Sequence, residues 1–300
     1  MDGTQIVTIV TTDTKTGKVV SEEQLILARE VQRAPAVQAP PKGTGLKGGK
    51  LVCSLDGKTV LAGAEQGTLL YRAGTDNDTD PMFRRVMEPY QDQTEEVVST
   101  ERTATGYKVV TKVSNRKNKF TVVDTYDGVE GCILVTSVLH CVSGGGYVPR
   151  FGKSFRLDEL FDKVRYVGRS GESYCDMKEQ FPIKDVTCTV ADMTEPNIRP
   201  QESGNRMDCT MASVSDGITK VTFEAVDQPF ELAIKPYTDK ALCAMKHRED
   251  EARTGTYVTI QAFQQGIGTG ACGPNIMPEF RFSVKKDYTL RFLIRVEQEG

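Results

Sequence analysis

A short acidic segment carries the densest group of side chains that could do polar chemistry. Asp76, Asn77 and Asp78 follow one another within residues 71–80, and Asp80 closes the run. Carboxylate and amide oxygens at this spacing can ligate a hydrated cation, hydrogen-bond sugar hydroxyls, or satisfy the main chain of a turn. The segment does not fit the calcium-binding loop pattern, which needs a glycine at position 6 and ligands to position 12. The residues alone leave the three alternatives open.

A glycine-rich segment near the end of the chain is the second candidate. Residues 265–274 hold four glycines and one proline between two strand-like stretches. Glycine lets a surface approach the main chain closely, at a cost in conformational entropy when the loop becomes ordered. The pattern is typical of a sheet-to-sheet crossover and also of a loop that faces a ligand, and the residues do not decide between them.

The two histidines give little support for acid–base or nucleophilic catalysis. His140 lies in an apolar strand-like run, which favours a neutral, hydrogen-bonded strand histidine over a catalytic base. His247 lies in a helix-like stretch, where a solvated or capping role is the default. No Gly-x-Ser-x-Gly motif is present. No pair of carboxylates stands out as the acid and base of a glycosidase, because their separation cannot be read from sequence.

Composition excludes several classes of partner. A net charge of −3, a pI near 5.7 and scattered Lys and Arg argue against nucleic acid. The first residues show no signal-peptide pattern, and no apolar run is long enough to span a membrane. The eight cysteines form no CxxC pair, which predicts free thiols in a reducing, cytoplasmic setting and no structural zinc site.

The elements that would position these residues are mostly strands. Residues 1–31 predict a two-stranded hairpin, which has no core of its own, and a proline-rich linker follows at 34–43. Two short helices are predicted, at 157–163 and at 238–251 with Thr238 as N-cap. Regular strand spacing predicts an antiparallel sandwich. The predicted strands are 51–54, 59–61, 95–103, 107–114, 119–126, 132–142, 154–157, 164–167, 186–190, 207–214, 219–224, 230–235, 256–262, 279–284 and 289–296.

Several segments, taken in order, resemble the C-terminal domain of the β-galactosidases of glycoside hydrolase family 2. The resemblance covers about residues 50–296, and the acidic turn shares it, with Gly74 where proline is usual. The segments that carry it are 71–78, 166–176, 196–206, 266–274 and 278–280.

This resemblance implies an all-β fold: a large antiparallel β-supersandwich of the galactose mutarotase-like type over 50–297. It also implies that residues 1–33 are the terminal strands of an immunoglobulin-like β-sandwich domain and that 34–49 are a linker. The chain would be the C-terminal domain or small subunit of a β-galactosidase, with the catalytic glutamates on a separate TIM-barrel domain or chain. The alternative is a free-standing galactose-binding or aldose-epimerase-like module.

The resemblance also implies partners and site residues. A barrel-bearing β-galactosidase chain or domain, a β-galactoside substrate and an oligomeric assembly are expected. No cofactor is expected in this chain, whereas the assembled enzyme could use Mg²⁺ and Na⁺. Many members end the glycine loop with a sugar-stacking tryptophan, and Cys272 stands there in this chain, which has no Trp. A second histidine usual in the preceding helix is replaced by Glu249. No catalytic residue is predicted here, and the predicted substrate-binding residues are Asp76, Asn77, His247, Gly270, Ala271 and Cys272.

Overall fold

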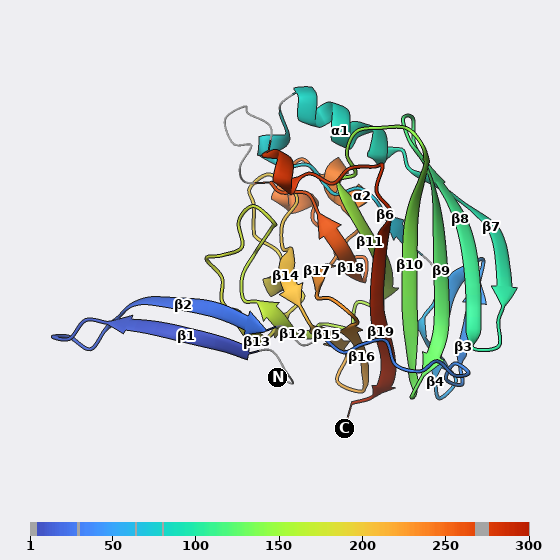
Figure 1. The fold of residues 1–300 in the computed structure, drawn as a ribbon, viewed down its shortest axis with the longest axis horizontal. Helices are drawn as coiled ribbons and strands as arrows, with labels where there is room; N and C mark the ends of the chain where they lie inside the picture. The colour runs from blue at the N-terminus through green and yellow to red at the C-terminus, as the bar shows by residue number, and fades with distance from the viewer. Residues whose placement is uncertain (1–4, 29–30, 64, 80, 268–275, 300) are drawn as a thin grey trace.

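The computed structural model describes residues 5–28, 31–63, 65–79, 81–267 and 276–299, without the side chains of 79 and 81–85. Figure 1 shows a body built almost entirely of strands, with a hairpin that projects from it. The described strands form sheets of nine, five, three and two strands. Apart from the hairpin, these sheets share one main hydrophobic core.

The nine-stranded sheet is antiparallel between every pair of neighbours. Most of its strands alternate between core-facing and solvent-facing residues, as β9 does with Val122, Asp124 and Tyr126 turned inward. In order across the sheet the strands are β13 (Ile183–Thr189), β12 (Lys163–Arg169), β15 (Met211–Ser215), β16 (Thr219–Ala225), β19 (Tyr288–Gln298), β10 (Cys132–Ser143), β9 (Lys119–Val129), β8 (Gly106–Ser114) and β7 (Thr94–Arg102).

The five-stranded sheet packs its apolar side against the nine-stranded one. The rings of Phe155, Phe223 and Phe292 meet between the sheets with centroids 5.6–6.3 Å apart. This aromatic contact joins residues of both sheets into one core, which confirms the predicted all-β antiparallel sandwich. In order the strands are β14 (Arg206–Cys209), β17 (Phe230–Lys235), β18 (Thr256–Gln264), β11 (Arg150–Leu157) and β6 (Gly67–Leu69); a three-stranded sheet of β3 (Thr44–Lys47), β4 (Lys50–Leu55) and β5 (Lys58–Leu61) adds to the same core.

The helices differ from the prediction in place and length. Helix α2 (Asp239–Ala244) begins as predicted, because Thr238 Oγ1 accepts a hydrogen bond from the Ala241 main chain at 3.1 Å. The predicted end at 251 is wrong. The Asp250 carboxylate accepts the main-chain N–H groups of Lys246 and His247, and only a 3₁₀ turn (Arg248–Asp250) follows.

Two further predicted elements are absent from the described chain. Residues 157–163 form a turn, in which the Asp158 side chain accepts the Leu160 N–H at 3.0 Å and Phe161 enters the core. Residues 279–284 form no strand; a 3₁₀ turn (Pro278–Phe280) begins there on a proline, which has no N–H for a sheet ladder. Helix α1 (Pro81–Gln91) was not predicted, and it carries Met87 and Tyr90 into the core.

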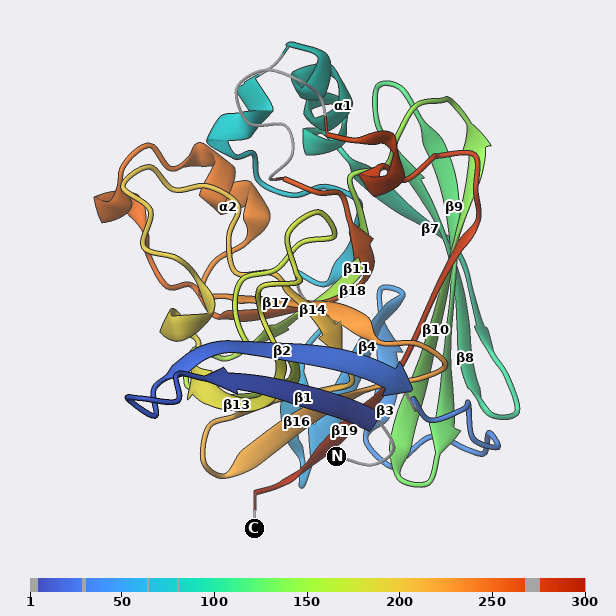
Figure 2. The same cartoon turned by 60° about the vertical axis from the view of Figure 1, so that its left-hand side comes forward.

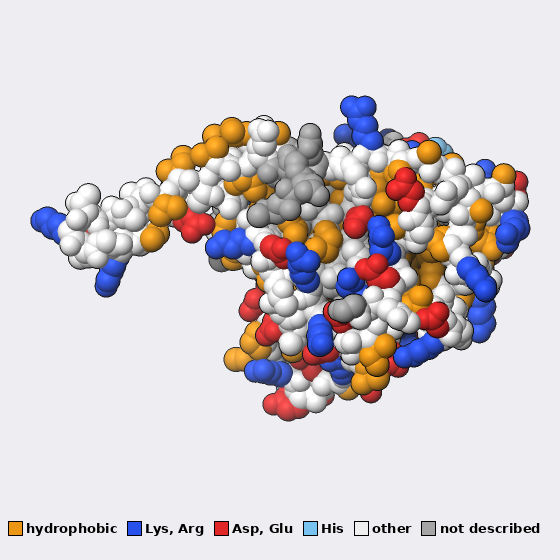
Figure 3. Space-filling view, turned by 90° about the horizontal axis from the view of Figure 1, so that it is seen from below, with side chains coloured by type: hydrophobic (Ala, Val, Ile, Leu, Met, Phe, Trp, Pro, Cys, Tyr) orange, Lys and Arg blue, Asp and Glu red, His pale blue; other side chains and the backbone are white. Residues whose placement is uncertain are grey.

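The hairpin of β1 (Gln5–Thr12) and β2 (Val19–Ala28) stands apart from this core (Figures 1 and 2). Gln24 anchors it to the body, donating to the Ile183 carbonyl at 3.2 Å and accepting from the Ile183 N–H at 2.7 Å. One face of the hairpin therefore turns to β13. The opposite face exposes a set of apolar side chains: Val7, Ile9, Leu25 and Leu27, each between 42 and 58 % exposed. Hydrophobic side chains are visible along this arm in Figure 3.

Candidate functional site

A buried arginine stabilises the acidic turn. Both Asp78 carboxylate oxygens lie near the fully buried Arg72 guanidinium, at 2.7 and 3.3 Å. The same carboxylate accepts the Thr75 main-chain N–H at 2.6 Å. Asp78 therefore fixes the shape of the turn, and the bidentate contact gives it a defined orientation.

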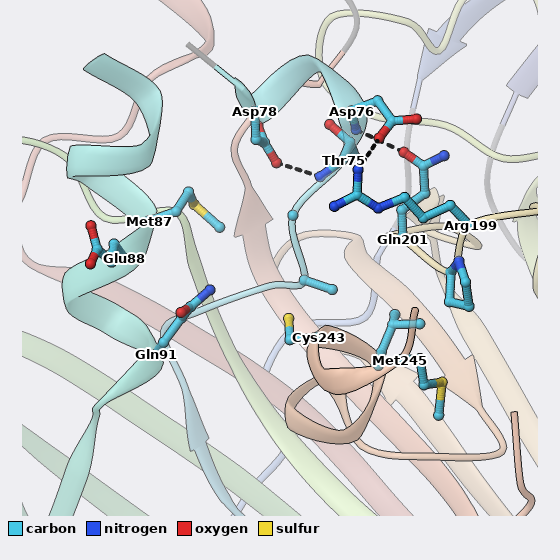
Figure 4. Close-up of a pocket in the computed structure, with 14 residues that line it drawn as sticks. Thr75, Asp76, Asp78, Met87, Glu88, Gln91, Arg199, Gln201, Cys243 and Met245 are labelled. Carbon is cyan, nitrogen blue, oxygen red and sulfur yellow. Dashed lines mark hydrogen bonds and ion pairs between the residues drawn. The ribbon is translucent and has the colours of Figure 1, made fainter. Parts of the chain in front are cut away.

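The exposed members of the turn contact two other segments. The Asp76 main chain donates to Gln201 Oε1 at 2.9 Å, and the Asp76 carboxylate lies 3.4 Å from Arg199 (Figure 4). The Asn77 amide donates to the carbonyl of Ile267 at 2.9 Å. The structure thus joins the acidic turn to the 196–206 segment and to the start of the glycine segment, three regions far apart in the sequence.

A pocket of about 450 Å³ opens beside this junction. Its walls are the acidic turn, α1, residues 199–201 and α2, as Figure 4 shows. Thr75 lines it, and the Thr75 hydroxyl is buried without a hydrogen-bond partner among the described residues. A buried hydroxyl without a partner costs free energy that a ligand or a water could recover. We call this cavity the turn pocket.

The predicted site residues are only partly assembled here. Asp76 lines the turn pocket, whereas the described lining includes neither Asn77 nor His247. His247 is exposed, with its main-chain N–H on Asp250. Gly270, Ala271 and Cys272 lie outside the described residues. The other histidine, His140, lies on β10 with Nδ1 2.7 Å from Asp287 Oδ1.

A buried cluster of four charges, which was not predicted from sequence, supports the pocket. Arg150 lies 3.0 Å from Glu202 and 2.9 Å from Asp239, and Lys235 lies 2.8 and 2.7 Å from the same two carboxylates. Burial alone would raise the pKa of Asp239, but Lys235 and Arg150 outweigh it and lower that pKa. The charges sum to zero, so the cluster is internally neutral. The signal for it was a lysine ending the apolar run of β17.

Glu202 connects this cluster to the turn. Its main-chain N–H donates to the Gly74 carbonyl at 3.2 Å, while its side chain receives Arg150 and Lys235. Because all four charged side chains are buried, none of them can reorient without leaving an unpaired charge. The cluster therefore fixes the relative positions of α2, the 196–206 segment and the turn.

A second buried network joins Asn205 to strands β17 and β18. The Asn205 amide donates to the Ser173 carbonyl at 2.9 Å and to Glu231 at 2.8 Å, and it accepts from Gln261 at 2.8 Å. The segments 166–176 and 196–206 therefore meet through Asn205, and Arg206 adds a hydrogen bond to the Tyr166 hydroxyl at 3.1 Å. Burial raises the pKa of Glu231 to about 7, with the Asn205 hydrogen bond opposing the shift.

This raised pKa predicts a pH-dependent stability. Below the usual value of 4.5 the Glu231 carboxyl is protonated in both states; as pH rises towards 7, only the unfolded chain loses its proton readily. The stability that Glu231 contributes to the folded state at low pH is therefore lost as pH rises. The free energy of unfolding should fall by about 3 kcal/mol by about pH 8. Glu231→Gln should lack this loss, so urea denaturation should find the variant increasingly more stable than the wild type as pH rises. Parallel pH profiles for the two proteins would contradict the assignment.

Three further features bear on function: the cysteines, the side chains that could ligate a metal, and the helices that could span a membrane. The seven described cysteines are free, and three of them, Cys53, Cys132 and Cys209, are buried. Within the described ranges, no group of three or more His, Cys, Asp or Glu side chains could hold a metal ion. No helix in the described part of the chain is long and apolar enough to cross a membrane.

Comparison with known proteins places these features in a family. The chain is 28 % identical over 243 residues to a β-galactosidase of Staphylococcus xylosus, covering 75 % of this chain and 24 % of that protein. It is 25 % identical over 241 residues to a β-galactosidase of Actinobacillus pleuropneumoniae, covering 74 % and 22 %. It thus spans about a quarter of the length of these curated relatives. A solved galactose mutarotase related enzyme of Lactobacillus acidophilus aligns at a TM-score of 0.43 and 10 % identity, covering 86 % of this chain and 97 % of that one.

The family model described as "Beta galactosidase small chain" matches residues 46–294, which include the five-stranded sheet, all but the end of β19 in the nine-stranded sheet, the turn pocket and the buried charge cluster. That match takes in most of the chain and confirms the resemblance of the ordered segments. This chain belongs to the β-galactosidase small chain family.

Proposed function

We propose that this chain is the C-terminal domain or small subunit of a β-galactosidase and that the turn pocket forms one wall of its galactoside-binding cleft. The observation that carries the proposal is the buried, unpaired Thr75 hydroxyl on the pocket wall, next to the junction of the acidic turn with the glycine segment. A sugar hydroxyl there would supply the missing hydrogen bond. Asp76, Arg199 and Gln201 offer further donors and acceptors at the same rim.

The catalytic carboxylates would come from outside this chain. A TIM barrel takes about 250 residues of alternating strands and helices. The described residues here form antiparallel sheets with two α helices, and the part of this chain that matches the first relative covers 24 % of that protein. We therefore assign hydrolysis of terminal β-galactosides to an assembly with a barrel-bearing domain or chain. Gly270, Ala271, Cys272 and His247 remain proposed contacts in that assembly, and any Mg²⁺ or Na⁺ would bind outside this domain.

The hairpin supports an association of this kind. Two strands cannot bury their own apolar face, and the outward set Val7, Ile9, Leu25 and Leu27 has no cover among the described residues. We propose that this face packs against a β-sandwich of the larger enzyme, of which residues 1–33 are the last strands. The assembled enzyme would act in the cytoplasm as an oligomer.

The test is an assay of the chain alone and after combination with its barrel-bearing partner. The isolated chain should not hydrolyse a chromogenic β-galactoside, and the assembly should. In the assembly, Asp76→Ala should raise KM about fivefold with kcat little changed, because it removes one polar contact to the sugar. Asp185→Ala, which breaks an exposed ion pair with Arg165 on the far edge of the nine-stranded sheet, is the matched control and should leave KM unchanged.

Two results would overturn the proposal. Turnover by the isolated chain that is abolished by a point substitution within it would place the catalytic carboxylates here. An unchanged KM in the Asp76→Ala assembly, together with an unchanged KM in Thr75→Val, would remove the turn pocket from the cleft.

A further inference from the structure

A second pocket lies on the outer face of the five-stranded sheet. It has a volume of about 230 Å³ and shares one described lining residue, Gln91, with the turn pocket. Its floor is a row across three strands, in which Gly67 pairs with Ser154 and Ser154 pairs with Thr259. The neighbouring Phe155, Val258 and Ile260 are in the core, so Ser154 and Thr259 face outward. We call this cavity the sheet pocket.

Three hydroxyl groups in the sheet pocket lack a protein partner. Thr259 and Tyr237 are 5 % and 4 % exposed, and Ser154 is partly buried between Thr259 and Gly67. None of these three side chains makes a hydrogen bond with the described part of the protein, in contrast to the neighbouring Tyr257, whose hydroxyl donates to Glu65. The small size of Gly67, Ser154 and Thr259 explains why there is a hollow on the sheet but does not indicate a ligand. Three hydroxyls that line one hollow and make no hydrogen bond with the described protein can donate to and accept from a polar ligand placed there.

The charges around the sheet pocket are already neutralised. Lys235 and Asp239 belong to the buried four-charge cluster, Glu95 pairs with Lys50, and Glu65 lies 2.9 Å from Arg156. Among the described lining residues this leaves Lys240, exposed at the rim, as the charge without an ion pair. An ionic ligand would find little compensation inside, whereas a neutral ligand would meet fixed dipoles and hydroxyls.

We propose that the sheet pocket binds a neutral, hydroxyl-rich ligand of the size of one hexose ring. Its volume lies below the range of about 300–1,000 Å³ that is typical of sites for drug-sized ligands. Tyr71, Tyr90, Tyr237 and Tyr257 line it with apolar ring surface, which suits the CH groups of a pyranose. The hydroxyls of Tyr71, Tyr90 and Tyr257 are bonded to the protein, so the Tyr237 hydroxyl is the tyrosine tip that is open to a sugar hydroxyl. This site is separate from the proposed cleft and does not depend on it.

The experiment is an NMR titration of the isolated full chain with methyl β-D-galactopyranoside and methyl β-D-glucopyranoside, with glucose 6-phosphate as the anionic arm. At least one neutral sugar should bind saturably and shift the amides of Ser154 and Thr259. The double variant Ser154→Ala/Thr259→Val should weaken binding about tenfold and the conservative Tyr237→Phe about threefold, because each lost hydrogen bond to a neutral ligand has a modest effect. Thr222→Val is the matched control: it is a similarly buried threonine, at 8 % exposure, on the other large sheet.

Failure of this proposal can be told apart from failure of the proposed cleft. The absence of saturable binding by both neutral sugars would overturn the sheet pocket as a sugar site. Binding that survives the double variant and Tyr237→Phe but is lost in Asp76→Ala would move the ligand to the turn pocket and also overturn it. Tighter binding of glucose 6-phosphate that depends on Lys240 would replace the neutral ligand by an anion. The KM of the assembled enzyme enters none of these outcomes.

Discussion

Replacing Glu202 by alanine should lower the free energy of unfolding by about 3–5 kcal/mol, the largest loss we expect from any single polar substitution in this chain. The Glu202 side chain is fully buried and receives both Arg150, at 3.0 Å, and Lys235, at 2.8 Å. Its removal leaves two buried cations with Asp239 as their remaining carboxylate partner in the cluster. Urea denaturation of the isolated chain, followed by circular dichroism, would measure the loss.

A matched surface variant separates burial from charge. Asp162→Ala also removes a carboxylate from an arginine, Arg253, at 2.6 Å, but both side chains are about a third exposed, at 41 % and 32 %. It should cost less than about 1 kcal/mol. Glu202→Gln keeps the shape and removes the charge, so it should fall between wild type and Glu202→Ala. Equal losses for Glu202→Ala and Asp162→Ala would show that the cluster contributes no more than a surface ion pair.

The strands could be predicted from sequence because the alternation of core-facing and solvent-facing residues is a local pattern of residue types. In β19, apolar residues face the core at every second position, and β9 keeps the same period with Asp124 as a polar exception. Turns with Gly, Asn or Asp separate the strands. Prediction from the local pattern failed where a side chain accepts the main-chain N–H groups that a helix would use. Asp250 ends the helical stretch by accepting the N–H groups of Lys246 and His247, and Asp158 bends the chain where a helical pattern was present. Such bonds depend on geometry that no periodicity reveals.

The candidate site, too, could be predicted from sequence only in part. The acidic turn could be singled out from its composition, yet the opposite roles of its residues could not: Asp78 is buried against Arg72, whereas Asp76 faces the turn pocket. The role of Asp78 depends on the buried position of Arg72, and that of Asp76 depends on contacts with Arg199 and Gln201, which lie more than a hundred positions away in the chain. The sheet pocket was invisible for a related reason, because Gly67, Ser154 and Thr259 become neighbours only through strand register.

The buried charge cluster links these two cavities. Asp239 and Lys235 line the sheet pocket, while Glu202 bonds the Gly74 main chain of the turn pocket. A wall shared by two pockets must keep its shape when either is filled. An internally neutral cluster of four buried charges fits that role, since moving any one member leaves a buried charge unpaired. Glu202 variants should therefore alter both pockets, whereas Asp76→Ala should alter one.

Ile9→Glu should weaken the association between this chain and the barrel-bearing part of the enzyme by about 2 kcal/mol or more, roughly thirtyfold in Kd, because it buries a charge in an apolar contact. Ile9 is 52 % exposed on the outward face of the hairpin, between Val7 and the cross-strand Glu23. Ile218→Glu, the same substitution at a 71 % exposed isoleucine in the turn between β15 and β16, is the control and should leave Kd unchanged. Analytical ultracentrifugation of the mixed chains, with recovered β-galactosidase activity as the second readout, measures both.

Since the hairpin contributes nothing to the main core, the thermal stability of the isolated chain should be the same for wild type and both variants. An assembly that tolerates Ile9→Glu as well as Ile218→Glu would show that the outward face of the hairpin is not the contact.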